Sequence, residues 1–215
     1  ADYNGSETFT ITASDGELSD SQSITVTVNA VNDAPVATAG LSDITNEDQS
    51  VVVNLSGSDI DGDNLTFSLD TDAASGSVTI DGSIATYTPT SNFNGSDTFT
   101  FSVSDGELSD TAEVTLTVNA VNDAPVLAVV SDVSFDEDTS TSISVSGSDV
   151  DGDALTFSIT GGSEITATLD GSDITFAASE NFNGSETFTI AATDSELSDS
   201  QSITVTVNAV NDAPV

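Results

Sequence analysis

Aspartates alternate with other residues in two short acidic segments, Asp59-Ile-Asp61-Gly-Asp63 and Asp149-Val-Asp151-Gly-Asp153. Carboxylate oxygens are the ligands that hard cations prefer, and a central glycine lets such a loop curl several carboxylates around one ion. Asp and Gly are also common in plain polar turns, so a single copy would leave both interpretations open. Because the second copy occupies the same place in a repeated unit, the pattern predicts Ca²⁺ binding.

Two further polar clusters recur with these loops. Glu47-Asp48 returns as Glu137-Asp138, in each case just before an apolar stretch, and the alternative interpretation is a charged loop. The third cluster is the linker Asn119-Ala-Val-Asn122-Asp123-Ala-Pro125, in which proline favours extended backbone and stiffens the junction. A plain proline-containing linker is its simpler interpretation, but an Asn-Asp pair near each such proline favours metal binding.

The charge of the chain excludes several functions. It has 37 acidic residues, no Lys, Arg or His, and a formal net charge of −37. Binding to nucleic acid or to an anionic membrane requires basic residues, so neither partner is expected. Repulsion within such a chain destabilises the compact state unless cations neutralise it. A solvated acidic surface suited to a salty habitat is the alternative, but it does not explain why the acids recur at fixed positions.

Catalysis is not expected. A serine hydrolase triad needs a His-like base, which the chain lacks. A glycosidase-type pair of carboxylates is compatible with the composition. The acidic residues, however, recur at repeated positions instead of gathering once in a single cleft, and we therefore predict a non-catalytic protein.

Internal repetition organises the chain. The string Asn-Asp-Ala-Pro-Val occurs at Asn32–Val36, Asn122–Val126 and Asn211–Val215, and Ala1–Val36 matches Glu180–Val215 at all but six positions. Self-similarity at a fixed period indicates tandem modules. We expect the last part of one module in residues 1–36 and complete modules in 37–126 and 127–215.

The modules are expected to consist of β-strands. Period-2 alternation of apolar and polar residues, bounded by Gly, Asn, Asp and Ser, predicts half-buried strands. In the middle module this pattern covers Val51–Leu55, Asn64–Leu69, Ser77–Ile80, Ile84–Thr88, Thr98–Val103 and Ala112–Val118, and a short strand is expected near Ala37–Leu41. The last module repeats it at Ile143–Val145, Leu155–Ile159, Ile165–Leu169, Ile174–Phe176, Thr187–Ile190 and Ile203–Val207. About seven short strands in about 90 residues predict a β-sandwich.

The partial first module contains only the predicted strands Thr8–Thr12 and Ile24–Val28. A two-stranded hairpin is marginal by itself. It is therefore either a fragment of a neighbouring module or an element completed by another chain.

The three polar clusters together resemble the cadherin repeat, and more closely the bacterial cadherin-like tandem repeats of large surface proteins and adhesins. The resemblance covers essentially the whole chain. Its motifs are Glu47 before a strand, the Asp59/Asp61 loop, Phe101-Ser-Val-Ser-Asp105, and Asn122-Asp-Ala-Pro125. The segments Tyr87-Thr-Pro, Asn92-Phe-Asn-Gly and Phe99-Thr-Phe are typical of the bacterial group. The resemblance implies an all-β fold of seven-stranded Greek-key, Ig-like sandwiches arranged end to end.

The resemblance also implies calcium at the module junctions. At the first junction it implies the ligands Asn29, Asn32, Asp33, Asp59, Asp61 and Asp105. At the second it implies Glu47, Asn119, Asn122, Asp123, Asp149, Asp151 and Asp194. Where animal cadherins carry an acidic Asp-Arg-Glu motif this chain has Thr90-Ser-Asn92, and Asn119 replaces the usual aspartate, so we expect one or two ions per junction instead of three.

The sequence thus favours a calcium-stiffened, extracellular spacer or filament segment of a long repetitive surface protein. Its expected partners are the neighbouring modules, with identical chains or a surface glycan as further possibilities. One alternative function is a carbohydrate- or self-binding adhesive module, although aromatic residues are few: ten Phe, two Tyr and no Trp. Another is a filament subunit that assembles through the open hairpin of Ala1–Val36.

Overall fold

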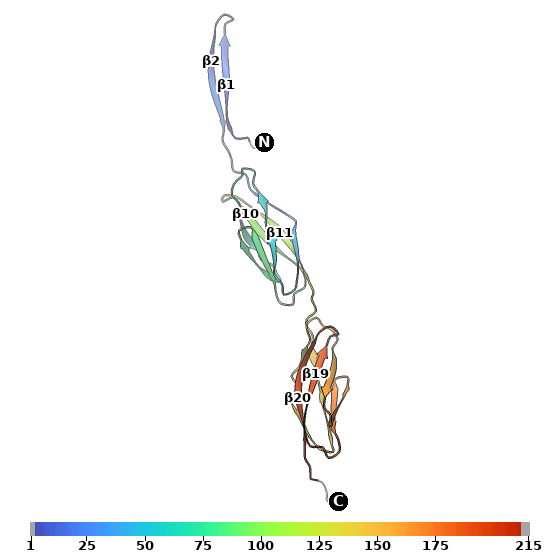
Figure 1. Ribbon diagram of the computed structural model, residues 1–215. Coiled ribbons are helices and arrows are strands. Elements are labelled where there is room, and N and C mark those ends of the chain that lie inside the picture. Colours follow the sequence, from blue (N-terminus) through green and yellow to red (C-terminus); the bar gives the residue numbers. More distant parts are fainter. Residues whose placement is uncertain (1–2, 212–215) are drawn as a thin grey trace. The chain divides into compact units, whose positions relative to one another are not determined.

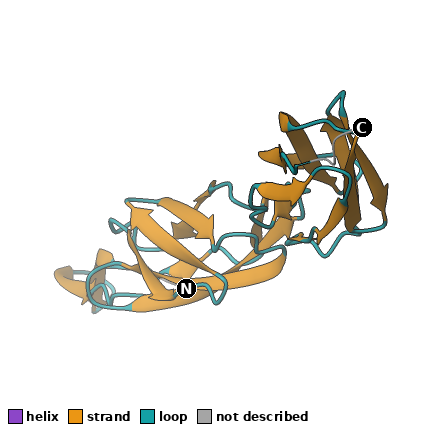
Figure 2. Ribbon diagram, turned by 90° about the horizontal axis from the view of Figure 1, so that it is seen from below, coloured by secondary structure: helices purple, strands orange, loops and turns teal. Residues whose placement is uncertain are grey.

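The computed structural model describes residues 3–211, which form strands joined by turns and loops (Figures 1 and 2). Most of the third Asn-Asp-Ala-Pro-Val string, residues 212–215, lies outside the described residues. The chain divides into two compact units, Ala1–Ala120 and Val121–Val215. Within residues 3–211 there is no helix long and apolar enough to cross a membrane.

The first unit begins with a hairpin. Strands β1 (Gly5–Ser14) and β2 (Ser19–Val28) pair antiparallel along their whole length. The turn between them is closed by Asp15, whose Oδ1 accepts the backbone N–H groups of Glu17 (3.0 Å) and Leu18 (2.8 Å). Both predicted strands of the partial module are confirmed, and each extends beyond its predicted ends.

The middle module of the first unit is a sandwich of two sheets. One sheet has the order β4-β11-β10-β7, in which β4 is parallel to β11 and the other pairs are antiparallel. The second sheet has the order β5-β9-β8, and a short pair joins β3 to β6. The bounds are β3 (Val36–Ala37), β4 (Leu41–Asn46), β5 (Val51–Asn54), β6 (Gly57–Ser58), β7 (Thr66–Thr71), β8 (Gly76–Asp81), β9 (Ile84–Pro89), β10 (Gly95–Ser104) and β11 (Ser109–Asn119).

The last module, in the second unit, has the same topology. Its sheets have the orders β13-β20-β19-β16 and β14-β18-β17, with the short pair β12-β15. The bounds are β12 (Val126–Leu127), β13 (Val133–Asp136), β14 (Ser140–Ser144), β15 (Gly147–Ser148), β16 (Thr156–Gly161), β17 (Ile165–Asp170), β18 (Asp173–Ala178), β19 (Gly184–Thr193) and β20 (Ser198–Asn208).

Each core lies between the two sheets of one module. In the middle module, Phe99 and Phe101 from β10 and Tyr87 from β9 are at most 1% exposed. In the last module, Phe188 from β19 packs edge-on against Phe176 from β18, with ring centroids 5.3 Å apart. Because side chains alternate across a strand, every second residue enters the core, as the sequence predicts. The all-β fold with seven main strands per sandwich is confirmed.

One predicted strand has different bounds. The short strand expected near Ala37–Leu41 is replaced by the two-residue β3, at Val36–Ala37, and by β4, which begins at Leu41 and ends at Asn46. Only alternate residues of β4 are half-buried, and most are polar. Its strand conformation comes from parallel pairing with β11, which apolar alternation in the sequence does not reveal.

Candidate metal-binding loops

Each acidic loop is folded by its first aspartate. Asp59 Oδ1 accepts the backbone N–H groups of Asp61 (2.8 Å), Gly62 (3.1 Å) and Asp63 (3.4 Å). Gly62 has a φ of 84°, a conformation that residues with a Cβ rarely adopt. The loop is therefore curled by one carboxylate oxygen acting on backbone donors, and the glycine of the motif is required by the turn.

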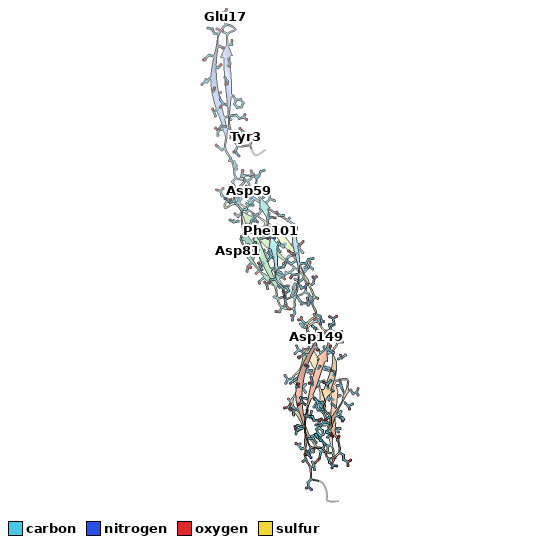
Figure 3. All side chains as sticks on the ribbon, in the orientation of Figure 1. Tyr3, Glu17, Asp59, Asp81, Phe101 and Asp149 are labelled. Carbon is cyan, nitrogen blue, oxygen red and sulfur yellow. The ribbon has the colours of Figure 1, made fainter. Side chains whose placement is uncertain are left out.

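The corresponding loop of the last module is built in the same way. Asp149 Oδ1 accepts the N–H groups of Asp151 (2.9 Å) and Asp153 (3.3 Å), and Gly152 has a φ of 82°. Figure 3 labels both first aspartates, Asp59 and Asp149, each at the end of its own module. The recurrence in the sequence is therefore a recurrence of geometry.

The second oxygen of each first aspartate is the notable one. Asp59 Oδ2 and Asp149 Oδ2 are both buried and accept no hydrogen bond. A buried ionised oxygen without a partner is costly unless a cation lies beside it. In the first loop the carboxylate oxygens of Asp59, Asp61 and Asp63 lie within 4.8 Å of one another, the only such acidic triad among residues 3–211. This donor set, all oxygen and all anionic, suits a hard cation such as calcium.

The linker residues join each loop through matching contacts. In the first unit the N–H of Asp33 donates to Asp61 Oδ2 (2.8 Å), and Asn32 Nδ2 donates to Asp105 Oδ2 (2.9 Å). A cleft of about 560 Å³ lies here, and Asp61, Asp63 and Asp105 are among its lining residues. Asn29 lines an adjoining cleft together with Asp33 and Asp61. The six residues expected at the first junction are thus brought together.

In the second unit the same pair of contacts is present. The N–H of Asp123 donates to Asp151 Oδ2 (2.9 Å), and Asn122 Nδ2 donates to Asp194 Oδ2 (2.9 Å). Five of the seven residues expected at the second junction, those from Asn122 onward, are therefore held together within this unit.

The turns after β10 and β19 hold Asp105 and Asp194 in place. Asp105 Oδ1 accepts the backbone N–H groups of Glu107 and Leu108, both at 2.7 Å. These bonds, with that of Leu108 first and the Asn32 amide next, lower the pKa of Asp105 below its usual value. The pKa of Asp194 is lowered in the same way by Leu197 and by Asn122. Both carboxylates stay ionised, as a cation ligand must.

The Glu-Asp pairs lie at the opposite end of each module. Glu47 is 4% exposed, and its N–H donates to the carbonyl of Asn119 (2.9 Å). Asp48 has a φ of 59°, and its Oδ1 accepts the N–H of Asn92 (3.2 Å). The glutamate is thus directed toward the end of β11, while the aspartate tethers the segment that lacks the acidic motif of animal cadherins. The joining of Glu47 and Asn119 to the Asp149 loop stays a prediction.

Two acidic residues with clear roles were missed in the sequence-based site. Asp63 belongs to the acidic triad, and its signal was present as the third acid of the alternating motif. Asp97 is 6% exposed and binds the loop between β7 and β8 through the N–H groups of Ala74 (3.1 Å) and Ser75 (2.9 Å). Its single acidic letter within a strand carries no local signal, because its partners lie more than twenty residues away.

Comparison with known proteins places these features in a family. The bacterial Ig domain family matches the chain twice, over residues 32–117 and 122–206. Chitinase A of Pseudoalteromonas piscicida is 37% identical over 134 residues, which cover 59% of this chain and 16% of the chitinase. The chain thus spans a small part of the length of this curated relative.

Solved structures of cadherin repeats share the fold. Human protocadherin-24 EC1-2, form II, has a TM-score of 0.55 at 21% identity and covers 85% of this chain and 100% of its own. PcdhgB3 EC1-4 has a TM-score of 0.56 at 16% identity, over 96% of this chain and 58% of its own. Domains with this fold are typically extracellular and non-catalytic. The chain belongs to the bacterial Ig domain family, with two tandem copies that have the fold of cadherin repeats.

Proposed function

We propose that this chain is a calcium-stiffened spacer segment of an extracellular repeat protein and that it is not an enzyme. The observation that carries the proposal is the buried second oxygen of Asp59 and of Asp149, which accepts no hydrogen bond at the same place in both acidic loops. A plain polar turn needs only the first oxygen of each aspartate, which already closes the loop. A bound cation gives the second oxygen a purpose.

Charge supports the same assignment. The chain has no Lys, Arg or His, so no side chain of its own can neutralise these carboxylates. Cations from solution are the available source, and a hard divalent ion matches an all-oxygen donor set. Calcium would supply positive charge where the linker meets the acidic loop. The loop and linker would then no longer repel each other, and the linker would become stiffer.

The proposed ligands follow the contacts. At the first loop they are the residues already expected, Asn29, Asn32, Asp33, Asp59, Asp61 and Asp105, with Asp63 added because it completes the triad. At the second loop they are Asn122, Asp123, Asp149, Asp151 and Asp194. Glu47 and Asn119 are retained as ligands on the basis of the cadherin resemblance. With this number of carboxylates we expect one or two ions per junction.

Thermal unfolding with calcium and with a chelator tests the metal. A ligand that binds only the folded form stabilises it by RT ln(1 + [L]/Kd), about 2.7 kcal/mol at a hundredfold excess over Kd. We expect a higher melting temperature in calcium. Asp59→Asn should remove the effect on the first unit, because it replaces the buried oxygen by an NH₂ group and leaves the acceptor that closes the loop.

A charge-matched control is Asp81→Asn, which removes one carboxylate from the exposed β8–β9 turn (Figure 3). This variant should respond to calcium as the unaltered chain does. Equal melting temperatures in calcium and chelator for the unaltered chain would remove the calcium proposal. An equal loss of response in both variants would reduce it to general screening of charge.

Stiffening is a separate measurement. NMR relaxation of the linker amides at residues 29–34 should show smaller fast motions in calcium than in chelator. Binding of calcium without any change in these amides would leave a calcium-binding protein but would contradict the stiffened linker.

A second candidate rests on the similarity to Chitinase A over 59% of this chain. In such a setting the modules would be non-catalytic parts of a polysaccharide-degrading enzyme and would hold a carbohydrate or separate other domains. Sedimentation of the chain with chitin tests binding directly. Retention on chitin would favour the carbohydrate-binding module, whereas its absence together with calcium-dependent stiffening would favour the spacer.

A further inference from the structure

The hairpin β1–β2 has one apolar face that is open to solvent. The antiparallel register places alternate residues of both strands on this face. Its five large apolar side chains are 44% to 56% exposed and are Phe9, Ile11, Ile24, Val26 and Val28. The opposite face carries only Ser and Thr on both strands.

The same face is covered in the last module. There the equivalent side chains are at most 3% exposed and are Phe188, Ile190, Ile203, Val205 and Val207. They pack against the other sheet, β14-β18-β17, in one core. Each is the same residue type as its hairpin counterpart, so the hairpin presents the inner surface of a sandwich without the second layer.

Three polar residues on this face show what the missing layer must offer. In the last module, Asp199 Oδ2 accepts the N–H of Leu127 (2.9 Å). Gln201 Oε1 accepts the N–H of Val130 (2.9 Å), and Gln201 Nε2 donates to the carbonyl of Val130 (3.0 Å). Glu186 Oε2 accepts the N–H groups of Ser163 and Ile165, both at 2.9 Å.

The hairpin carries the same three polar residues at the equivalent positions, namely Asp20, Gln22 and Glu7. They lie on the apolar face, opposite Ala13, Ile11 and Val26 in the register. The matching partners in the last module all belong to the segment from Leu127 to Ile165. The hairpin therefore has the complete complement, apolar and polar, for a segment of that kind.

We propose that the apolar face of the hairpin docks a segment of the same module type, equivalent to residues 126–178, and so closes a third sandwich. Such a segment supplies both the apolar layer and the backbone N–H groups that Asp20, Gln22 and Glu7 are placed to accept.

Two other occupants fit less well. A second hairpin packed face to face would bring the carboxylates of Glu7 and Asp20 from both copies together, without a donor for any of them. An intact second copy offers residues 126–178 already covered by β19–β20. Exchange there would replace contacts by the same contacts and would gain nothing. The occupant is therefore a segment that lacks its own last two strands.

Docking would also reach the first acidic loop, an extension that rests on the proposed calcium site. In the last module the N–H of Glu137 donates to the carbonyl of Asn208 (2.9 Å), and Glu137 Oε1 accepts the N–H of Val210 (2.6 Å). The hairpin counterparts of these partners are Asn29 and Val31, which line the cleft beside Asp61. The docked segment would thus bring a glutamate to this cleft.

The test uses the full chain, labelled with ¹⁵N and co-expressed with residues 126–179 as a separate polypeptide, in the presence of chelator. Co-purification and slower exchange of the β1–β2 amides, by roughly 100-fold or more, are expected, because amides in covered core strands exchange by larger openings than exposed ones. Working in chelator makes this result independent of calcium, so failure of the proposed calcium function is read separately.

A second form guards against poor folding of the separate segment. Residues 126–179 are joined ahead of Ala1 through a flexible Gly/Ser linker, and the matched control carries Ile11→Asp and Ile24→Asp on the hairpin. Protection of β1–β2 in the joined form and its loss in the control would support the proposal. Unprotected hairpin amides in the joined form would overturn it. Protection of the chain alone that grows with concentration would also overturn it, in favour of a second copy.

Discussion

Tyr87 donates its phenolic O–H to Asp97 Oδ2 at 3.0 Å, inside the core of the middle module. The same oxygen accepts the N–H of Ser75 at 2.9 Å. Burial, then the neighbouring carboxylate, raises the pKa of Tyr87, so the phenol remains a donor. In the last module the pair becomes Phe176 and Glu186. The longer acid reaches the loop by itself and adds a bond from the Ser163 hydroxyl (2.7 Å).

Tyr87→Phe should therefore destabilise the middle module by about 1.5–3 kcal/mol, because it removes a hydrogen bond to a buried charged acceptor. Adding Asp97→Glu recreates the pair of the last module and should recover part of the loss. The measurement is a double-mutant cycle from urea unfolding, followed by NMR signals of the middle module. If Asp97→Glu has the same cost in the Tyr87→Phe variant as in the unaltered chain, the two residues are not coupled.

Glu186 should make the last module sensitive to acid. The Ser163 hydroxyl, with backbone N–H groups of the same loop, lowers the pKa of Glu186 from 4.5 to about 2. Because the folded pKa is the lower one, the stabilisation is present above the unfolded value and is lost as the pH falls toward 2. The difference in unfolding free energy between the unaltered chain and Glu186→Gln should therefore shrink across this range.

The control for Glu186→Gln is Glu7→Gln, the same substitution at the equivalent position of the exposed hairpin. NMR-detected urea unfolding of the last module at several pH values measures both. Glu7→Gln should leave the pH profile of the last module unchanged. A free-energy difference for Glu186→Gln that stays constant with pH would contradict the role of the carboxylate.

Ser195→Gly should stabilise the last module by about 1 kcal/mol. Ser195 has a φ of 98°, whereas glycine occupies the same turn position as Gly106, with a φ of 106°. Left-handed backbone costs a non-glycine residue about 1–3 kcal/mol, and the added freedom of glycine in the unfolded chain offsets part of this. The reverse change, Gly106→Ser, should destabilise the middle module, although a Cβ there would meet no atom within 4 Å. Chemical denaturation of both variants gives the sign.

The two acidic loops should bind calcium independently. Asp59→Ala with Asp61→Ala should abolish binding at the first loop and leave the second, since each loop is closed by its own aspartate. Calorimetric titration of this double variant, with Asp149→Ala and Asp151→Ala as its counterpart, counts the remaining sites. Loss of all binding in either variant would show that the sites act as one.

Much of this protein can be predicted locally. Alternation such as Phe99, Phe101, Val103 specifies a strand and its inward face, because successive side chains of a strand point to opposite sides. The repeats determine the module plan, and the composition excludes basic chemistry. The acidic loops are also local, since one carboxylate closes each turn over the next four residues.

The tertiary structure decided what depends on distant partners. Strand β4 exists because it pairs with β11, more than sixty residues away, and its polar sequence gives no alternating signal. Asp97 is a clamp because the fold brings the N–H groups of Ala74 and Ser75 to it. The β1–β2 hairpin and the β19–β20 hairpin have nearly the same sequence, yet one apolar face is exposed and the other buried. Alternation specifies which side chains face inward, but only a second sheet removes them from water.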